Sequence, residues 1–135
     1  MRVTVKKAER PIKWMSPESL ERGVFNSKTD VWSYGVTIWE VMTRGVQPYP
    51  NLQNWEVLQY IKYGHRLPNI EQCPPDMHEI MLSCWNSRPA MRSTFNELIK
   101  GIEAMVRRLE SENNDRYACP RNLEVNYINM QPLIG

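Results

Sequence analysis

The residues best able to do chemistry on their own are three cysteines and two histidines. Cys73, Cys84 and Cys119 are odd in number and show neither C-x-x-C spacing nor a paired histidine cluster, which argues against a disulfide framework and a zinc site. His65 and His78 have no serine, cysteine or carboxylate partner at a spacing typical of a nucleophile and its base. We therefore expect no catalytic residue and no metal ligand among these side chains, and a reducing compartment.

The composition is that of one ordinary globular domain. The chain has 135 residues, of which 41% are hydrophobic and 24% are charged. Its net charge of +2 is too small to suggest electrostatic binding to nucleic acid or to an anionic membrane. Apolar runs reach at most three residues, as at 80–82, so neither a membrane helix nor a signal peptide can be built from this stretch. We expect a soluble domain whose partners bind at specific sites.

Turn residues separate five helical patterns, and no segment alternates as a half-buried strand does. These patterns predict helices over residues 17–22, 27–43, 54–63, 75–85 and 95–111. Capping-box spacing at Ser27–Asp30 and at Thr94–Glu97, and a cap at Asn54, mark three of the starts. The helix over 27–43 is apolar on almost every face and should be buried by the other four. The ordered part is therefore expected to be an all-α, irregular helical lobe, with a flexible tail from residue 112.

Four sequence blocks then occur in a specific order. They are Pro-Ile-Lys-Trp-Met-Ser-Pro-Glu at 11–18, Asp-Val-Trp-Ser-Tyr-Gly-Val at 30–36, the stretch 45–50, and Cys84-Trp85 followed by Pro89, Arg92 and Phe95. In this order and at these separations they resemble the signatures of the large lobe of a protein tyrosine kinase, over residues 11 to about 110. Within tyrosine kinases the chain most resembles the Axl and Mer receptor group, with the hepatocyte growth factor receptor group a close second.

The resemblance implies an architecture and an activity. It implies a helical C-lobe of the protein kinase fold with a buried central helix, in which residues 1–10 end the activation segment, 11–111 form the partial kinase domain and 112–135 form a disordered tail. It implies part of a receptor-type tyrosine kinase, on the cytoplasmic side of the plasma membrane, that transfers the γ-phosphoryl group of ATP to protein tyrosine. ATP and magnesium belong to the intact parent, and no cofactor is expected in this stretch.

The same resemblance assigns a substrate platform to Pro11, Lys13, Trp14 and Met15. A planar tyrosine ring needs a flat apolar surface, which Pro11 and Trp14 are able to provide. Lys13 would face an acidic flank of the substrate or lie in solvent. The alternative is an ordinary loop before a helix.

Further residues have scaffold roles by resemblance. Glu18 is expected to pair with Arg92 inside the protein; the alternative is that Glu18 only favours a helix N-terminus. Asp30 is expected to accept hydrogen bonds from the catalytic loop, or otherwise to cap its helix. Trp32 and Trp85 are expected in the core. Gly35 lies in the same block as Asp30 and Trp32, residues 30–36, and is also expected to have a structural role.

A tyrosine motif in the tail suggests a partner. Tyr127 is followed by Asn129 two residues later and by Met130 three residues later, in a polar segment. Such motifs resemble docking sites for phosphotyrosine-reading adapter domains, in which an arginine receives the phosphate. Asparagine two residues after the tyrosine resembles the preference of growth-factor adapters. Methionine three residues after the tyrosine resembles the preference of the phosphoinositide kinase regulatory subunit.

The catalytic signatures of a kinase are missing from this sequence. It contains no glycine-rich loop, no His-Arg-Asp and no Asp-Phe-Gly. We therefore expect the stretch to be inactive alone. One hypothesis is a partial sequence of a receptor tyrosine kinase that acts on protein tyrosines; the other is a catalytically inactive helical interaction module that presents Tyr127 to adapters.

Overall fold

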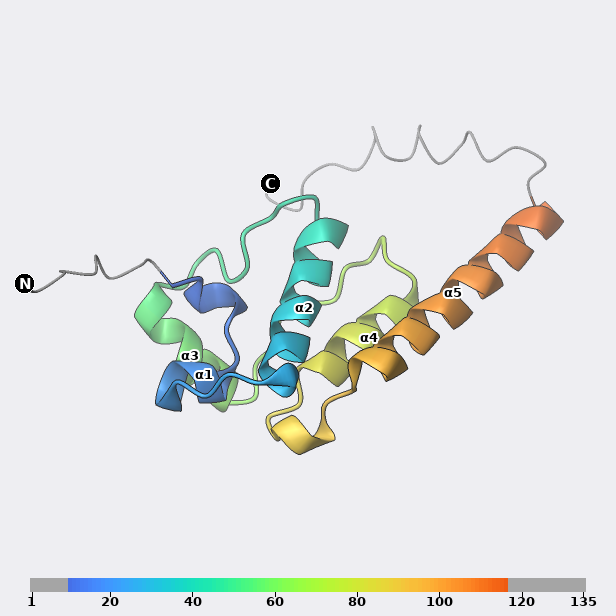
Figure 1. Cartoon of the computed structure of the whole chain (residues 1–135). Helices are drawn as coiled ribbons and strands as arrows, with labels where there is room; N and C mark the ends of the chain where they lie inside the picture. The colour runs from blue at the N-terminus through green and yellow to red at the C-terminus, as the bar shows by residue number, and fades with distance from the viewer. Residues whose placement is uncertain (1–9, 117–135) are drawn as a thin grey trace, which may run out of the picture.

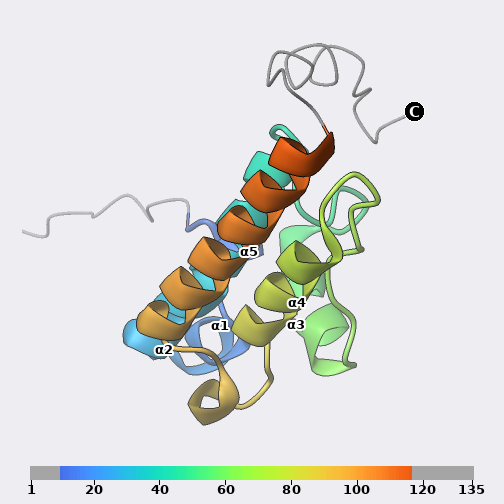
Figure 2. The same ribbon diagram turned by 90° about the vertical axis from the view of Figure 1, so that its right-hand side faces the viewer.

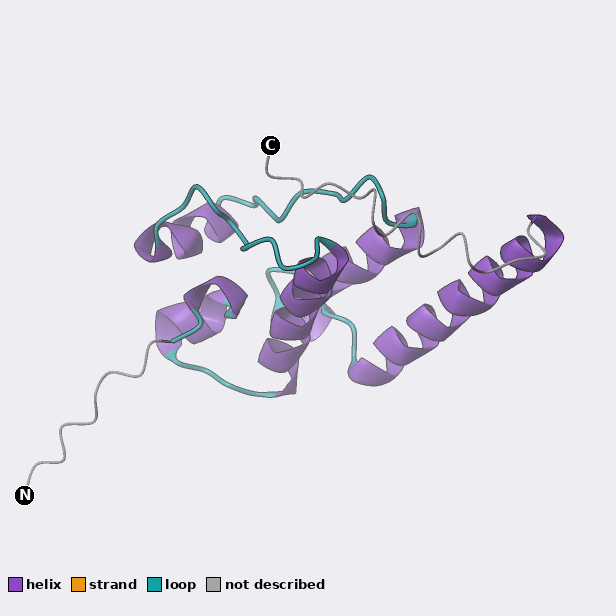
Figure 3. Ribbon diagram, turned by 90° about the horizontal axis from the view of Figure 1, so that it is seen from above, coloured by secondary structure: helices purple, strands orange, loops and turns teal. Residues whose placement is uncertain are grey.

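The computed structural model describes residues 10–116, and the side chains of residues 10–113. Its elements are η1 (Ile12–Trp14), α1 (Pro17–Arg22), α2 (Ser27–Met42), α3 (Asn54–Lys62), α4 (Pro75–Cys84), η2 (Pro89–Met91) and α5 (Phe95–Arg116). No strand occurs in this part of the chain, and the expected all-α architecture is confirmed (Figure 3). The expected helices are all present, and their ends differ from the predicted ends by a few residues.

Helix α2 is the centre of the lobe (Figure 1). It contacts α4, η1 and η2, while α1 and η1 both contact α3. Helices α4 and α5 lie side by side along the lobe (Figure 2). The core is built from side chains of all four longer helices: Val31, Trp32, Val36 and Trp39 of α2, Val57 and Ile61 of α3, Met81 and Cys84 of α4, and Leu98 and Met105 of α5.

The start of α2 is set by Asn26, one residue before the predicted capping box. The Asn26 Oδ1 accepts from the backbone N–H groups of Lys28 at 3.0 Å and Thr29 at 3.2 Å, and the Thr29 hydroxyl accepts from the Asn26 N–H at 2.8 Å. These bonds satisfy the free donors of the first turn. The prediction that Ser27 and Asp30 form the box is therefore wrong, because Asn26 and Thr29 already fill both roles.

One stripe of α2 remains uncovered. Its exposed residues recur at helical spacing and are Asp30, Tyr34, Thr37 and Val41. The Tyr34 ring meets the Phe95 ring of α5 edge to face, with centroids 5.7 Å apart. The apolar members of this stripe and of the adjoining part of α5 form a surface that we call the open face: Tyr34, Val41, Phe95 and Ile99, which are 40%, 64%, 37% and 52% exposed.

Helix α5 runs to Arg116 rather than ending near Ser111. Arg108 bonds to Glu112 one turn later at 2.9 Å and to Asp76 of α4 at 2.9 Å, which favours a further turn of helix. The predicted start of the tail at residue 112 is therefore wrong. The predicted tail beyond this helix, residues 117–135, lies outside the described residues.

Candidate functional site

Glu18 and Arg92 meet in a buried, bidentate ion pair. Ser16 caps α1 by accepting from the Ser19 N–H at 3.3 Å, and Pro17 starts the helix, which places Glu18 in the first turn. The two guanidinium nitrogens of Arg92 lie 2.6 Å and 2.8 Å from the two carboxylate oxygens of Glu18. Glu18 is 6% exposed and Arg92 is 2% exposed. The pair implied by the sequence is present, across 74 positions of the chain.

Arg92 also binds the segments around this pair. Its Nε donates to the Asn86 carbonyl at 2.8 Å, and one Nη donates to the Lys28 carbonyl at 3.0 Å. Lys28 returns a bond from its ammonium to the Arg92 carbonyl at 2.6 Å. The site therefore joins α1, the first turn of α2, and the segment between α4 and α5.

The electrostatics of the pair make it structural rather than catalytic. Burial raises the pKa of Glu18, but the hydrogen bonds and positive charge of Arg92 outweigh burial and leave that pKa below its ordinary value. Arginine stays protonated in proteins. Because its lowered pKa keeps Glu18 ionised near neutral pH, this carboxylate holds the lobe together and is poorly suited to acid–base chemistry.

Two tryptophans and one glycine form the packing around the pair. Trp32 and Trp85 are 0% and 3% exposed, as expected of core residues. The guanidinium groups of Arg92 and Arg66 lie 5.0 Å and 5.1 Å from the Trp32 ring centroid. A Cβ on Gly35 would lie 2.6 Å from the Cys84 Cβ and 2.7 Å from the Trp85 Nε1, so only glycine lets α2 approach α4 this closely.

The predicted substrate platform is present only in part. Pro11 is exposed and Trp14 is half-buried against the core, so both still reach the surface, whereas Met15 is 7% exposed. Lys13 is neither substrate-facing nor solvated: it is 6% exposed, and its ammonium donates to the Tyr49 carbonyl at 2.9 Å. The prediction for Lys13 is wrong because η1 packs against α2 and α3 and turns this side chain inward.

The Lys13 bond fixes an unusual turn in the loop after α2. Tyr49 has a φ of 47°, a left-handed conformation that is costly for a residue with a large side chain. The bond from Lys13 to its carbonyl holds that conformation and ties the loop to η1. A lysine flanked by isoleucine and tryptophan is the only sequence signal that points to this contact.

Asp30 is exposed and its carboxylate has no hydrogen-bond or ion-pair partner among the described side chains. Asn26 caps the helix in its place. Arg66, which the sequence analysis did not single out, binds the Trp85 and Ile61 carbonyls at 2.9 Å and so joins α3 to the end of α4. No signal short of the fold itself identifies Arg66 as such a link.

The remaining predicted sites are not part of this geometry. Tyr127, Asn129 and Met130 lie outside the described residues. Within residues 10–116, no three histidine, cysteine or acidic side chains gather where a metal ion would bind. None of the helices in that range has the length and apolarity needed to cross a membrane.

Comparison with known proteins agrees with the fold and with the motif blocks. Residues 2–102 match the family model of protein tyrosine and serine/threonine kinases. The chain is similar to the tyrosine-protein kinase transforming protein RYK of avian retrovirus RPL30, with 44% identity over 102 residues. That match covers 76% of this chain and 23% of the relative, so the chain spans about a quarter of the length of the protein it matches. The chain belongs to the protein tyrosine and serine/threonine kinase family.

Proposed function

We propose that this chain is the substrate-side helical lobe of a protein tyrosine kinase, and that the complete enzyme moves the γ-phosphoryl group of ATP to a tyrosine hydroxyl of a protein. ATP and magnesium are held by residues outside this sequence, which has no glycine-rich loop, His-Arg-Asp or Asp-Phe-Gly. The part played by this lobe is to bind and orient the protein substrate, which is a large share of catalysis in phosphoryl transfer.

The observation that carries the proposal is the way η1 is held beside the Glu18–Arg92 pair. The turn is anchored on one side by the bond from Lys13 to the Tyr49 carbonyl and on the other by the buried ion pair of α1. Next to the Lys13 anchor, Pro11 and Trp14 reach the surface. A rigid turn that presents a proline ring and an indole suits a planar phenol and the residue that follows it in a substrate.

The test of tyrosine kinase function places the lobe in a complete kinase. In a chimaera, residues 11–102 replace the corresponding segment of the avian retroviral relative. The purified chimaera is assayed with ATP, magnesium and two peptides that differ only by tyrosine or serine at the acceptor position. We expect phosphorylation of the tyrosine peptide alone. A folded chimaera that modifies the serine peptide, or neither peptide, contradicts the proposal.

The platform is tested in the same chimaera with Pro11→Ala. Losing two apolar ring methylenes should lower kcat/KM for the tyrosine peptide by about tenfold, through KM for the peptide, with KM for ATP unchanged. Tyr63→Phe is the control, because Tyr63 is 75% exposed just after the last residue of α3. A change in KM for ATP with no change in KM for the peptide would show that Pro11 is not part of the substrate platform.

Alone, the chain is expected to be inactive. Incubation with ATP, magnesium and the tyrosine peptide should give no phosphopeptide. Turnover that Asp30→Ala abolishes would contradict this expectation, because it would require a catalytic carboxylate within the chain.

The receptor assignment is also part of the proposal and is supported by sequence resemblance. The proposed parent is a receptor-type kinase of the Axl and Mer group, with the hepatocyte growth factor receptor group second, and its kinase region lies on the cytoplasmic side of the plasma membrane. A transcript that extends upstream into His-Arg-Asp and a membrane-spanning segment would support it. An upstream reading frame that encodes a kinase without such a segment would contradict it.

A second function is supported by the sequence around Tyr127. We propose that phosphorylated Tyr127 binds adapter domains through Asn129 or Met130. A phosphopeptide covering residues 123–133 is titrated against a growth-factor adapter domain and a phosphoinositide kinase regulatory domain. Asn129→Ala should weaken the first and Met130→Ala the second, with the unphosphorylated peptide as control. Equal binding of the phosphorylated and unphosphorylated peptides contradicts the proposal.

A further inference from the structure

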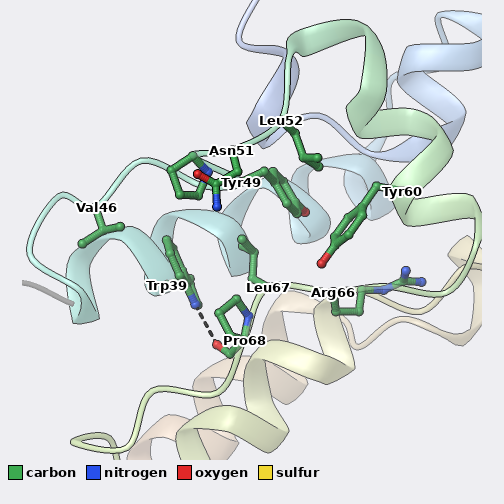
Figure 4. A pocket seen from close by; sticks show the side chains of 10 residues that line it. Trp39, Val46, Tyr49, Asn51, Leu52, Tyr60, Arg66, Leu67 and Pro68 are labelled. Atoms are coloured by element: carbon green, nitrogen blue, oxygen red, sulfur yellow. Dashed lines mark hydrogen bonds between the residues drawn. The ribbon is translucent and has the colours of Figure 1, made fainter. Parts of the chain in front are cut away.

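A cavity opens between the end of α2, the loop after it and α3 (Figure 4). Its volume is about 590 Å³, within the range of sites that hold small organic molecules. Its lining is mainly aromatic and aliphatic and consists of Trp39, Val46, Tyr49, Pro50, Asn51, Leu52, Tyr60, Arg66, Leu67 and Pro68. The cavity is separate from the exposed Pro11 and from the Glu18–Arg92 pair, neither of which lines it.

The walls of the cavity are fixed by contacts within the protein. The Trp39 indole N–H donates to the Pro68 carbonyl at 2.9 Å, which holds this ring as one wall (Figure 4). The rings of Tyr49 and Tyr60 meet edge to face with centroids 5.8 Å apart, and Tyr60 stacks on His65 at 4.6 Å. Flat rings held in this way favour a flat, rigid ligand, because little side-chain freedom is lost on binding.

Two hydroxyl groups face the cavity without partners. Figure 4 shows the Tyr60 hydroxyl directed toward Leu67 and the Tyr49 hydroxyl directed toward the space between Tyr60 and Leu67. Neither hydroxyl makes a hydrogen bond with any described residue, although Tyr49 is only 6% exposed. Neither hydroxyl oxygen is among the buried polar atoms of the described residues that lack a partner, so both oxygens reach the open space of the cavity. Each phenol hydroxyl is therefore able to donate a hydrogen bond to an acceptor on a molecule in the cavity.

The charge near the cavity favours an acceptor of negative charge. Arg66 is the one charged residue among the ten that line it, and its guanidinium binds neutral oxygens only, those of Trp85, Ile61, His65 and Ser87. Burial raises the pKa of Tyr49, and the positive charge of Arg66 opposes that rise, so this charge acts at the Tyr49 hydroxyl. An anionic group is thus preferred to a cationic one at this end of the cavity.

We propose that this cavity binds a small, flat aromatic molecule that carries a carboxylate, with the aromatic body against Trp39 and Leu67 and the carboxylate accepting hydrogen bonds from the hydroxyls of Tyr49 and Tyr60. This site is additional to the proposed kinase function and does not depend on it. Each phenol donates to the carboxylate, a charge-assisted bond stronger than a neutral one.

The test uses the full 135-residue chain and naphthalene-2-carboxylate as the probe, followed by NMR of labelled Val and Leu methyl groups. We expect shifts confined to Val46, Leu52 and Leu67, which line the cavity. Tyr49→Phe and Tyr60→Phe, which keep the rings and remove one donor each, should each raise Kd by about fivefold to tenfold. Tyr63→Phe is the control, because Tyr63 directly follows α3, is 75% exposed and lies outside the lining, so Kd should stay unchanged.

Two further measurements separate specific binding in the cavity from non-specific hydrophobic binding. Leu52→Trp fills the cavity and should abolish the shifts, with retained methyl dispersion showing that the fold persists. The cation 2-(aminomethyl)naphthalene has the same aromatic body and should bind at least tenfold more weakly. The proposal is overturned by any of three results. These are no methyl shift at millimolar probe, shifts centred on Val41 of the open face, or a Kd for the carboxylate probe that equals both the Kd of the cationic probe and the Kd measured with Tyr49→Phe.

Discussion

Arg92 connects three parts of the chain through one side chain. Its guanidinium binds the Glu18 carboxylate and the carbonyls of Lys28 and Asn86, and lies over the Trp32 ring. Because Arg92 is only 2% exposed, water does not replace a partner that is removed. The energetic role of the pair is thus measured by removing one member and leaving the other charge buried.

Glu18→Ala should lower the free energy of unfolding by about 3–5 kcal/mol, because it leaves the Arg92 charge buried and unpaired. The measurement is urea unfolding of the 135-residue chain. Glu21→Ala is the matched control on the same helix: Glu21 pairs with Lys62 at 2.9 Å, but the two side chains are 47% and 52% exposed, so the change should be close to experimental error. Equal effects of the two substitutions would mean that the buried pair adds no more than a surface pair.

The same pair makes stability depend on pH. Burial raises the pKa of Glu18, yet the hydrogen bonds and charge of Arg92 leave it lowered in the folded chain, so the unfolded chain binds this proton more readily. The stabilisation is fully present above the unfolded pKa of about 4.3 and is lost as pH falls through the lower, folded value. Urea unfolding of the parent chain should therefore show a steeper fall in stability below about pH 5 than Glu18→Gln, which has no carboxyl to titrate. Parallel pH profiles would contradict the lowered pKa.

The Glu18–Arg92 pair was predicted from the resemblance to tyrosine kinases, because both residues lie in blocks that match the family's large lobe. The resemblance did not predict the place of Lys13, although Lys13 belongs to such a block too. A lysine in a single short turn carries no periodicity that indicates which way its side chain points. Its direction follows from the packing of η1 on α2 and α3, which appears only in the fold.

At the scale of elements, the closest packing occurs between α2 and α4. The backbone at Gly35 faces Cys84 and Trp85, and an added Cβ would fall within 2.7 Å of both. The atoms it would meet are a Cβ and a buried indole nitrogen, neither of which moves away easily. The distance between the two helices therefore depends on the absence of a side chain at this position.

Gly35→Ala should destabilise the chain by about 1–2 kcal/mol, because the cost of overpacking exceeds the gain in helix propensity. Gly101→Ala is the control within α5: its Cβ would lie 3.7 Å from Ile80, an ordinary contact, so the substitution should stabilise the chain by about 0.5–1 kcal/mol. Thermal unfolding measures both. Two substitutions that shift Tm in the same direction would show that propensity, rather than the α2–α4 contact, decides the outcome.

The sequence predicted the helices well and their ends less well, for reasons that lie in individual side chains. Asn26 rather than Ser27 caps α2, because its amide oxygen reaches two backbone donors. Before α3 the Gln53 N–H is satisfied by Glu56 at 2.7 Å, so the expected cap at Asn54 became the first helical residue. Helix α5 is longer than predicted because Arg108 reaches both Asp76 and Glu112. Several residues able to cap a helix lie near the starts of α2 and α3, and the sequence pattern alone does not show which of them makes the hydrogen bonds.

At the scale of the whole lobe, α2 has contacts on most sides and an exposed apolar stripe on the remaining one. The open face of Tyr34, Val41, Phe95 and Ile99 carries large apolar side chains in solvent. On the proposed kinase function, the remainder of a complete kinase domain would cover the open face, which would explain this exposure. The proposal therefore predicts that a charged substitution on the open face destabilises a complete kinase domain but not the 135-residue chain.

Val41→Glu tests this dependence. In the 135-residue chain Val41 is 64% exposed, so the substitution should change the free energy of unfolding by no more than about 0.5 kcal/mol. In the chimaera with the avian retroviral kinase the same carboxylate would be buried without a partner, and both Tm and tyrosine phosphorylation should fall strongly. Met91→Glu is the matched control: Met91 is 66% exposed on η2 and is not one of the open-face residues, so the substitution should be tolerated in both proteins. A chimaera that accepts Val41→Glu as readily as Met91→Glu would mean that the open face remains in solvent in the complete kinase, and the proposed position of this lobe in the enzyme would then be wrong.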